Sequence, residues 1–210
     1  MTLRSIYETR NIPRYSRQKN IYRFISYKNQ CTYYLESYLE FCYCFWLEFL
    51  SNVERYRTQP ASLKFIKNLK KYSYTPDFLI YDVAQKLIFD EVKPLIFISQ
   101  EKIQNELLWI RALCYERGIG FKVTTDQLIY QPGLDTLKEL YKYTFVTPTI
   151  KQLDTIHKSV DQKGHTLGTL LEFCRKDQIA DQVAYFSMFK QSLVWPIEQP
   201  LSPSLPLKAA

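Results

Sequence analysis

Three polar residues lie at the ends of a segment that otherwise has the pattern of a β-hairpin, residues 74–94, with the sequence YTPDFLIYDVAQKLIFDEVKP. Asp77 precedes the first apolar run, and Glu91 and Lys93 end the second. Because Asp77 and Glu91 are equidistant in sequence from Ala84, a turn at that residue sets the two carboxylates opposite each other. Alternate side chains of a strand share a face, so Lys93 lies on the same side as Glu91. The spacing therefore predicts that the three polar side chains converge at the open end of the hairpin.

Two carboxylates with a lysine beside them could bind Mg²⁺ and hydrolyse a phosphodiester. Carboxylate oxygens are the hard ligands that Mg²⁺ prefers, and the bound ion also accepts a substrate phosphate. The metal lowers the pKa of a bound water, and Lys93 could position or deprotonate that water or stabilise charge on the phosphate. The alternative is a cross-strand ion pair between Asp77 and Lys93 on a solvated face. The Asp/Glu-x-Lys pattern recurs at residues 161–163, but in a loop without a facing acid, and this contrast favours the catalytic interpretation of the hairpin.

A further acid comes from the segment that precedes the hairpin. Residues 34–50, YLESYLEFCYCFWLEFL, contain no Gly or Pro and are apolar on nearly every face, which predicts a buried helix. Glu36 and Glu40 stand on one side of this helix at i, i+4 spacing, which is unfavourable for two like charges unless a cation lies beside them. Since a carboxylate on an apolar helix is costly, Glu40 is expected either near a metal or at the helix rim.

The segments around the hairpin predict an α/β domain. Leu63 and Phe65 alternate with polar neighbours, as in a strand. A helical stripe runs through residues 99–117 and ends at Gly118, and the sequence GFKVTT that follows has the character of a strand. The order helix, strand, strand, strand, helix, strand predicts a small mixed sheet flanked by helices.

The chain is expected to contain a second, smaller domain. A nuclease domain with a basic N-terminal arm is predicted for residues 1–143. Three helices and a β-hairpin predict a winged-helix-like domain for residues 144–196. The Pro- and Ser-rich residues 197–210 are predicted to be a disordered tail.

Composition limits the classes of function. The net charge of +7 and the pI near 9.0 favour a polyanionic partner, nucleic acid first. The five cysteines form no Cys-x-x-Cys pair and only two histidines are present, so neither a zinc site nor a disulfide framework is expected. The N-terminus has no apolar signal region and no apolar run approaches membrane-spanning length. These features predict a cytoplasmic protein with no membrane partner.

Pro76-Asp77 together with Glu-Val-Lys at residues 91–93 is the PD-(D/E)xK signature of restriction-endonuclease-like nucleases. The stretches LESYLEFCYCFWLEFLSNVERYRTQP, YTPDFLIY and DEVKP resemble TnsA, the endonuclease subunit of heteromeric cut-and-paste transposases, including those of CRISPR-guided transposons. The resemblance spans residues 10–128. It implies a restriction-endonuclease-like fold and a Mg²⁺-dependent activity in which Mn²⁺ could substitute.

The resemblance also implies the residues of the site. The helical acid of the family lies in a Ser-x-Leu-Glu stretch before Gln-Pro, which here is Glu40 before Gln59-Pro60, with Glu36 as its close competitor. The residues implied as catalytic are Glu40, Asp77, Glu91 and Lys93, and those implied as metal ligands are Glu40, Asp77, Glu91 and Val92.

The resemblance further implies cleavage at the 5′ ends of double-stranded transposon-end DNA. The implied partners are a TnsB-like DDE transposase, which breaks and joins the other strand, and a TnsC-like AAA+ ATPase, which regulates both. Two alternatives are a stand-alone restriction or repair nuclease of the same fold and a non-enzymatic winged-helix DNA-binding adaptor built on residues 147–195. That segment has little net positive charge, which favours a partner-docking role for it. The sequence leaves open the oligomeric state, the cleavage position and the targeting pathway.

Overall fold

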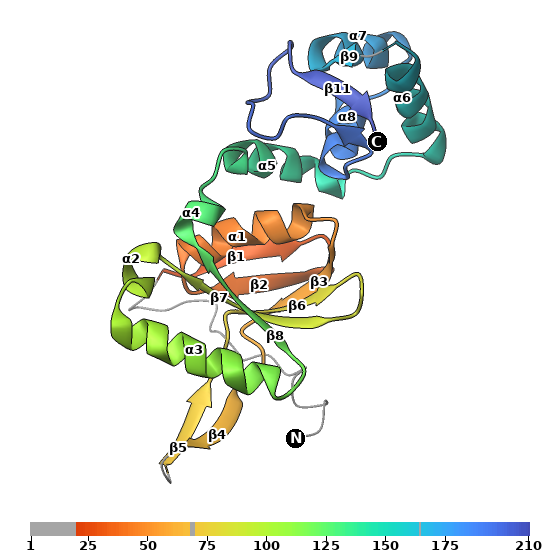
Figure 1. The fold of residues 1–210 in the computed structure, drawn as a ribbon. Coiled ribbons are helices and arrows are strands. Elements are labelled where there is room, and N and C mark those ends of the chain that lie inside the picture. The colour runs from red at the N-terminus through yellow and green to blue at the C-terminus, as the bar shows by residue number, and fades with distance from the viewer. Residues whose placement is uncertain (1–19, 68–69, 164) are drawn as a thin grey trace. The chain divides into compact units, whose positions relative to one another are not determined.

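The computed structural model describes residues 20–67, 70–163 and 165–210 of the chain. The chain divides into two compact units, Met1–Tyr130 and Gln131–Ala210, whose elements are labelled in Figure 1. None of the helices in these described ranges has the length and hydrophobicity of a membrane span.

The first unit is built around a four-stranded mixed sheet with the strand order β3-β6-β7-β8. Its strands are β3 (Val53–Thr58), β6 (Phe78–Asp82), β7 (Leu87–Lys93) and β8 (Gly120–Thr125). Strand β6 is antiparallel to both β3 and β7, whereas β8 is parallel to β7. A parallel pair needs a crossover connection, and α3 (Glu101–Tyr115) lies within it. The predicted mixed α/β fold is confirmed, and it is consistent with a restriction-endonuclease-like architecture.

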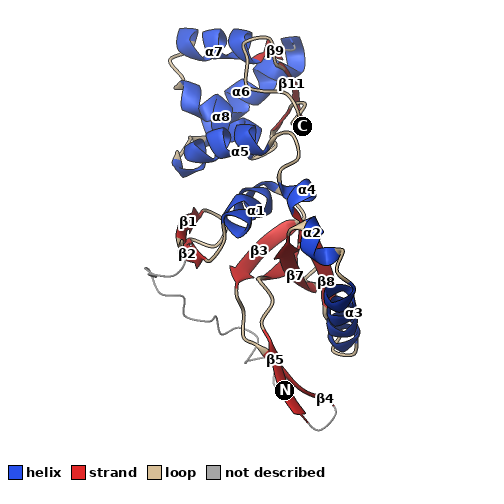
Figure 2. Cartoon of the chain, turned by 90° about the vertical axis from the view of Figure 1, so that its left-hand side faces the viewer, coloured by secondary structure: helices blue, strands red, loops and turns tan. Residues whose placement is uncertain are grey.

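Helices cover the two faces of this sheet. Helix α1 (Tyr38–Phe49) lies on one face and α3 on the other, as the views in Figures 1 and 2 agree. Leu79 and Phe89 pack in a hydrophobic core with residues of α3. On the opposite face, the ring of Tyr43 in α1 meets that of Phe78 edge-on, with centroids 5.3 Å apart. Because successive side chains of β6 and β7 point to opposite faces, these two strands contribute apolar side chains to the cores on both sides of the sheet.

Helix α1 starts later than predicted. Its N-cap is Ser37, whose Oγ accepts a hydrogen bond from the backbone N of Glu40 at 3.1 Å. The predicted first residues of the helix instead end β2 (Cys31–Leu35), which is paired antiparallel with β1 (Tyr22–Ser26). Strand β1 belongs to the predicted basic N-terminal arm, of which residues 1–19 lie outside the described residues.

A second hairpin extends from the sheet region in Figure 1 and consists of β4 (Leu63–Lys67) and β5 (Lys70–Tyr74). The predicted strand at Leu63 and Phe65 is thus confirmed. The ring of Phe65 contacts that of Trp109 in α3, with centroids 4.2 Å apart, which anchors the hairpin to the helix. The remaining helices of the first unit are α2 (Leu95–Ile98) and α4 (Asp126–Ile129).

The second unit combines helices with a small antiparallel sheet of order β10-β11-β9. Its elements in chain order are α5 (Leu134–Tyr141), the 3-10 helix η2 (Lys142–Phe145), α6 (Ile150–Lys163), β9 (His165–Thr166), α7 (Leu167–Lys176), α8 (Asp181–Phe189), β10 (Leu193–Val194) and β11 (Pro206–Ala209).

The boundary between the units lies after Tyr130, not after residue 143 as predicted. Helix α5 belongs to the second unit because it packs there on α8, with the rings of Tyr141 and Phe189 5.4 Å apart. Residues 197–210, which were predicted to be a disordered tail, instead contain strand β11. The leucines at positions 205 and 207 are buried, an alternation that the Pro- and Ser-rich composition concealed.

Candidate active site

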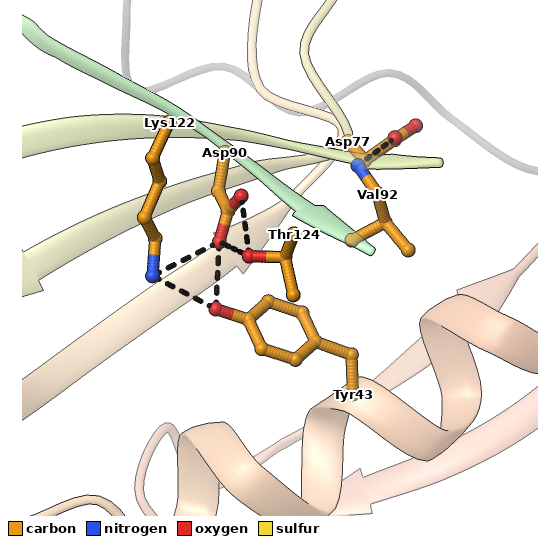
Figure 3. Close-up of polar contacts among 6 residues, drawn as sticks. All are labelled: Tyr43, Asp77, Asp90, Val92, Lys122 and Thr124. Atoms are coloured by element: carbon orange, nitrogen blue, oxygen red, sulfur yellow. Dashed lines mark hydrogen bonds and ion pairs between the residues drawn. The ribbon is translucent and has the colours of Figure 1, made fainter. Parts of the chain in front are cut away.

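The pairing of β6 with β7 has the register that the sequence predicted. Phe78 pairs with Asp90, so the next step along the ladder sets Asp77 against Glu91. Asp77 lies just before β6, and its Oδ2 accepts a hydrogen bond from the backbone N of Val92 at 2.8 Å (Figure 3). This bond holds the carboxylate of Asp77 at the end of β7.

Glu91 is buried, and both oxygens of its carboxylate have donors. Its Oε1 lies 2.5 Å from Nζ of Lys93, and its Oε2 accepts a hydrogen bond from the hydroxyl of Tyr74 at 2.5 Å. Burial lowers the pKa of Lys93, but its hydrogen bond to Glu91 and the charges of Glu91 and Asp77 outweigh that effect and raise it. Lys93 is therefore a cation in this arrangement.

Tyr74 is a site residue that the sequence did not predict. It stands at the end of β5, opposite Leu63, so its position depends on how the β4–β5 hairpin packs. Burial, followed by the negative charge of Glu91, raises the pKa of Tyr74, which keeps the phenol protonated and able to donate. In the sequence, Tyr74 is marked only by its position three residues before Asp77, in the stretch YTPD. Nothing in the residue spacing connects it with Glu91.

Glu40 occupies the first turn of α1 and is only 6% exposed. Its Oε1 accepts a hydrogen bond from Oγ of Ser37 at 2.7 Å, while its Oε2 is buried and has no hydrogen-bond partner among the described residues. Burial raises the pKa of Glu40, and the charges of Glu36 and Glu91 raise it further against the opposing hydrogen bond from Ser37. An unpartnered carboxylate oxygen in this position is costly unless a cation approaches it.

Glu36, the competing acid, has a different environment. It is half-buried, and its Oε2 accepts a hydrogen bond from Nε2 of Gln59 at 3.2 Å. The backbone N of Gln59 donates to the carbonyl oxygen of Asp77 at 2.6 Å. Glu36 is therefore connected to Asp77 through Gln59, whereas the charge of Glu40 is among the main causes that raise the pKa of Asp77.

The acid–base equilibrium of Asp77 is strongly perturbed. Burial, followed by the charges of Glu91 and Glu40, raises its pKa from 3.8 to about 8. The bond from Val92 and the charge of Lys93 oppose this shift. Carboxylates from α1, from the loop before β6 and from β7 thus repel one another across one site.

These residues form no closed metal shell as they stand. Within the described ranges, no three His, Cys, Asp or Glu side chains are arranged as a metal-holding group. Glu91 is turned toward Lys93 and Tyr74. Val92 has an apolar side chain, so its backbone carbonyl oxygen is the only atom with which it could bind a metal. The donor set nevertheless fits Mg²⁺, because it consists of hard oxygens and includes the buried, unpartnered Oε2 of Glu40.

A polar network that the sequence did not reveal lies on the other face of β7 (Figure 3). Asp90 is fully buried and accepts hydrogen bonds from the hydroxyls of Tyr43 at 2.6 Å and Thr124 at 2.9 Å. Nζ of Lys122 lies 3.1 Å from Asp90 and 3.0 Å from the hydroxyl of Tyr43. Burial raises the pKa of Asp90, while Lys122 and the two hydroxyls oppose that shift.

A mixed sheet between two helices, with acids gathered at the end of its central hairpin, is consistent with a restriction-endonuclease-like fold. Residues 50–126, from β3 to β8, match the family model described as TnsA-like endonuclease N terminal. This part of the chain is therefore similar to a TnsA-like endonuclease domain, which confirms the resemblance seen in the sequence. The match includes Asp77, Glu91 and Lys93, whereas Glu40 precedes it. No curated protein matches the chain.

Proposed function

We propose that the protein is the metal-dependent endonuclease subunit of a transposase and cleaves the 5′ ends of transposon DNA by phosphodiester hydrolysis. One observation carries the proposal. In a TnsA-like endonuclease domain, the buried carboxylates of Glu40 and Glu91 and the half-buried carboxylate of Asp77 act on one another electrostatically beside the cationic Lys93.

Mg²⁺, or Mn²⁺ in its place, would be held by carboxylate oxygens of Glu40, Asp77 and Glu91 and by the carbonyl oxygen of Val92. When bound, such an ion supplies a water of lowered pKa and stabilises negative charge on the phosphate. The protein's part is to present the carboxylates. Asp77 gives up its proton, and Oε2 of Glu91 gives up its hydrogen bond from Tyr74 while Oε1 keeps its bond to Lys93.

Lys93 has a separate role in the proposal. A protonated ammonium group cannot accept a proton, so Lys93 acts as a hydrogen-bond donor that orients the attacking water or stabilises charge on the phosphate. Its bond to Glu91 keeps the ammonium group at the mouth of the hairpin. Loss of Lys93 would remove a charge next to the scissile phosphate and leave every carboxylate in place.

The distribution of charge supports a DNA substrate for the first unit. Residues 1–130 contain 19 Lys and Arg against 13 Asp and Glu, whereas residues 131–210 contain nine against eight. Almost all of the net charge of +7 therefore belongs to the unit with the acid site. Binding to a DNA backbone requires such an excess of cations.

The second unit is proposed to be a winged-helix-like domain that binds a protein partner. From α6 onward its elements follow the order helix, strand, helix, helix, strand, strand. The helix in the position of a recognition helix is α8, DQVAYFSMF, which contains Asp181 and no Lys or Arg. Because a helix that enters a DNA groove needs cations near the phosphates, this composition favours docking to the TnsB-like transposase or the TnsC-like ATPase.

The test is strand cleavage in a reconstituted reaction with the transposase, the ATPase and a transposon-end duplex labelled on the 5′-cleaved strand. Wild-type protein should cut this strand with Mg²⁺ and not with EDTA. Asp77→Ala should lose that cut while the transposase still cleaves the other strand. Wild-type cutting by Asp77→Ala would refute the site assignment. Efficient cutting by the chain alone would favour the stand-alone nuclease.

A further inference from the structure

The hydrogen-bond network around Asp90 connects α1, which carries Glu40, with β7, which carries Glu91. Asp90 precedes Glu91 on β7, so the two side chains point to opposite faces of the sheet. Asp90 points to the face that α1 covers, where it accepts a hydrogen bond from Tyr43. Its partners are Tyr43 on α1 and two residues of β8, Lys122 and Thr124 (Figure 3). Tyr43 is thus the only one of these partners that comes from α1.

Tyr43 follows Glu40 by one turn of α1, in the i, i+3 relation that places two residues on neighbouring parts of the helix surface. The hydrogen bond from Tyr43 to Asp90 is short, 2.6 Å, and both side chains are buried, with Tyr43 4% exposed and Asp90 0%. One buried bond therefore joins the turn of α1 that carries Glu40 to the residue of β7 next to Glu91.

We propose that Tyr43 and Asp90 are positioning residues, whose hydrogen bond sets the position of Glu40 relative to Glu91. This inference rests on the proposed metal-dependent function. Apolar packing alone, such as the contact of Tyr43 with Phe78, resists separation of helix and sheet but opposes sliding less strongly. A directional bond between a phenol and a carboxylate fixes the register of the two elements, and metal sites lose affinity when their supporting bonds are removed.

A purely structural role would not require this chemistry. Burying a carboxylate with a lysine is seldom more stabilising than burying apolar side chains of the same volume. Asp90 nevertheless lies directly beside Glu91 with donors from α1 and β8 around it. This arrangement is explained if the bond between Tyr43 and Asp90 serves to position Glu40 relative to Glu91.

The experiment compares Tyr43→Phe with Tyr56→Phe in the full-length chain. Tyr56 is the matched control, because it is a buried tyrosine whose hydroxyl also donates to a buried carboxylate, that of Glu48, at 2.8 Å. Glu48 belongs to the last turn of α1, away from Glu40, and it keeps a bond from the backbone N of Lys28 in the variant. The two substitutions remove the same atom from similar surroundings.

Binding of Mn²⁺ by metal-stripped protein is measured by calorimetry, and stability by thermal unfolding without metal. Both variants should lose similar stability. Tyr43→Phe should weaken Mn²⁺ binding about tenfold, the lower end of the effect of a supporting bond in metal sites. Tyr56→Phe should change it less than about twofold.

A second comparison asks whether Tyr43 acts through Glu40. In a Glu40→Gln background, Tyr43→Phe should no longer weaken Mn²⁺ binding further, because residues that act through one another are not additive. Equal weakening by Tyr43→Phe and Tyr56→Phe, or an undiminished effect of Tyr43→Phe in the Glu40→Gln background, would overturn the positioning role. Wild-type protein that binds no Mn²⁺ would overturn the proposed function as well, whereas normal binding by Tyr43→Phe would overturn the positioning role alone.

Discussion

Replacement of Asp77 by asparagine should stabilise the metal-free protein near pH 8 and abolish its metal binding. The carboxyl of Asp77 keeps its proton up to about pH 8 in the folded protein because burial and the charges of Glu91 and Glu40 disfavour its ionised form. Asparagine has nearly the same shape, and its amide oxygen can still accept the bond from Val92. The amide carries no charge for Glu91 and Glu40 to repel, and it binds Mg²⁺ poorly.

The sign of the pH effect follows from the raised pKa. A carboxyl that holds its proton more tightly when folded contributes stability that is fully present below pH 3.8 and is lost as the pH rises to about 8. Each tenfold change in proton affinity corresponds to about 1.4 kcal/mol, so the full shift would be worth on the order of 5 kcal/mol. Small movements of the three acids relieve part of the repulsion, and we expect a measured difference of about 2 kcal/mol at pH 8.

The assay is denaturant unfolding of wild-type protein and Asp77→Asn in EDTA at several pH values between 4 and 8. Tryptophan fluorescence reports mainly on the first unit, which contains Trp46 and Trp109, while Trp195 belongs to the second. The two stability curves should meet near pH 4 and separate as the pH rises, with the variant above the wild type. Curves that stay parallel across this range would show that Asp77 does not carry the strain assigned to it.

Three further predictions concern the other parts of the site and the second unit. Glu40→Gln should reduce strand cleavage and Mn²⁺ affinity by orders of magnitude, whereas Glu36→Gln should have a small effect; the reverse ranking would identify Glu36 as the helical acid. Lys93→Ala should keep Mn²⁺ binding by calorimetry while nicking by the same preparation falls, and loss of binding would make the lysine structural. A chain that ends at Tyr130 should fold by circular dichroism and bind Mn²⁺ but fail to co-purify with the ATPase; retained co-purification would move the partner contact to the first unit.

Local rules predicted the parts of the fold that depend on short distances in sequence. The facing of Asp77 and Glu91 follows from period-2 alternation and one turn, and the register of β6 on β7 agrees with it. Helix α3 and its end at Gly118, which has a φ of 67°, follow from helical periodicity and from the tolerance of glycine for positive φ. The TnsA-like motifs could be recognised for the same reason, because they lie within continuous stretches.

The remaining features depend on contacts between distant segments. The bond from Tyr74 to Glu91 exists because the β4–β5 hairpin packs on α3, and no local pattern encodes that packing. From local sequence alone, Asp90 would be placed on a solvent-exposed face of its strand. Its buried position depends on hydrogen bonds from Tyr43 and Thr124, which are far away in sequence. The first residues of the predicted helix belong to β2, and the sequence did not show this because aromatic residues are common both in strands and in buried helices.

Four acids of the first unit, Glu48, Asp90, Glu40 and Asp77, fall into two groups, and the difference between them locates the site. Glu48 and Asp90 each accept hydrogen bonds from donors on two other elements, as buried carboxylates must if they are only structural. Glu40 keeps a buried oxygen without a partner, and Asp77 accepts a bond from Val92 yet holds its proton to about pH 8. The domain therefore satisfies the carboxylates of Glu48 and Asp90 and leaves those of Glu40 and Asp77 strained. Strain of this kind persists where function requires it, and a divalent cation shared by Glu40 and Asp77 would relieve it in both at once.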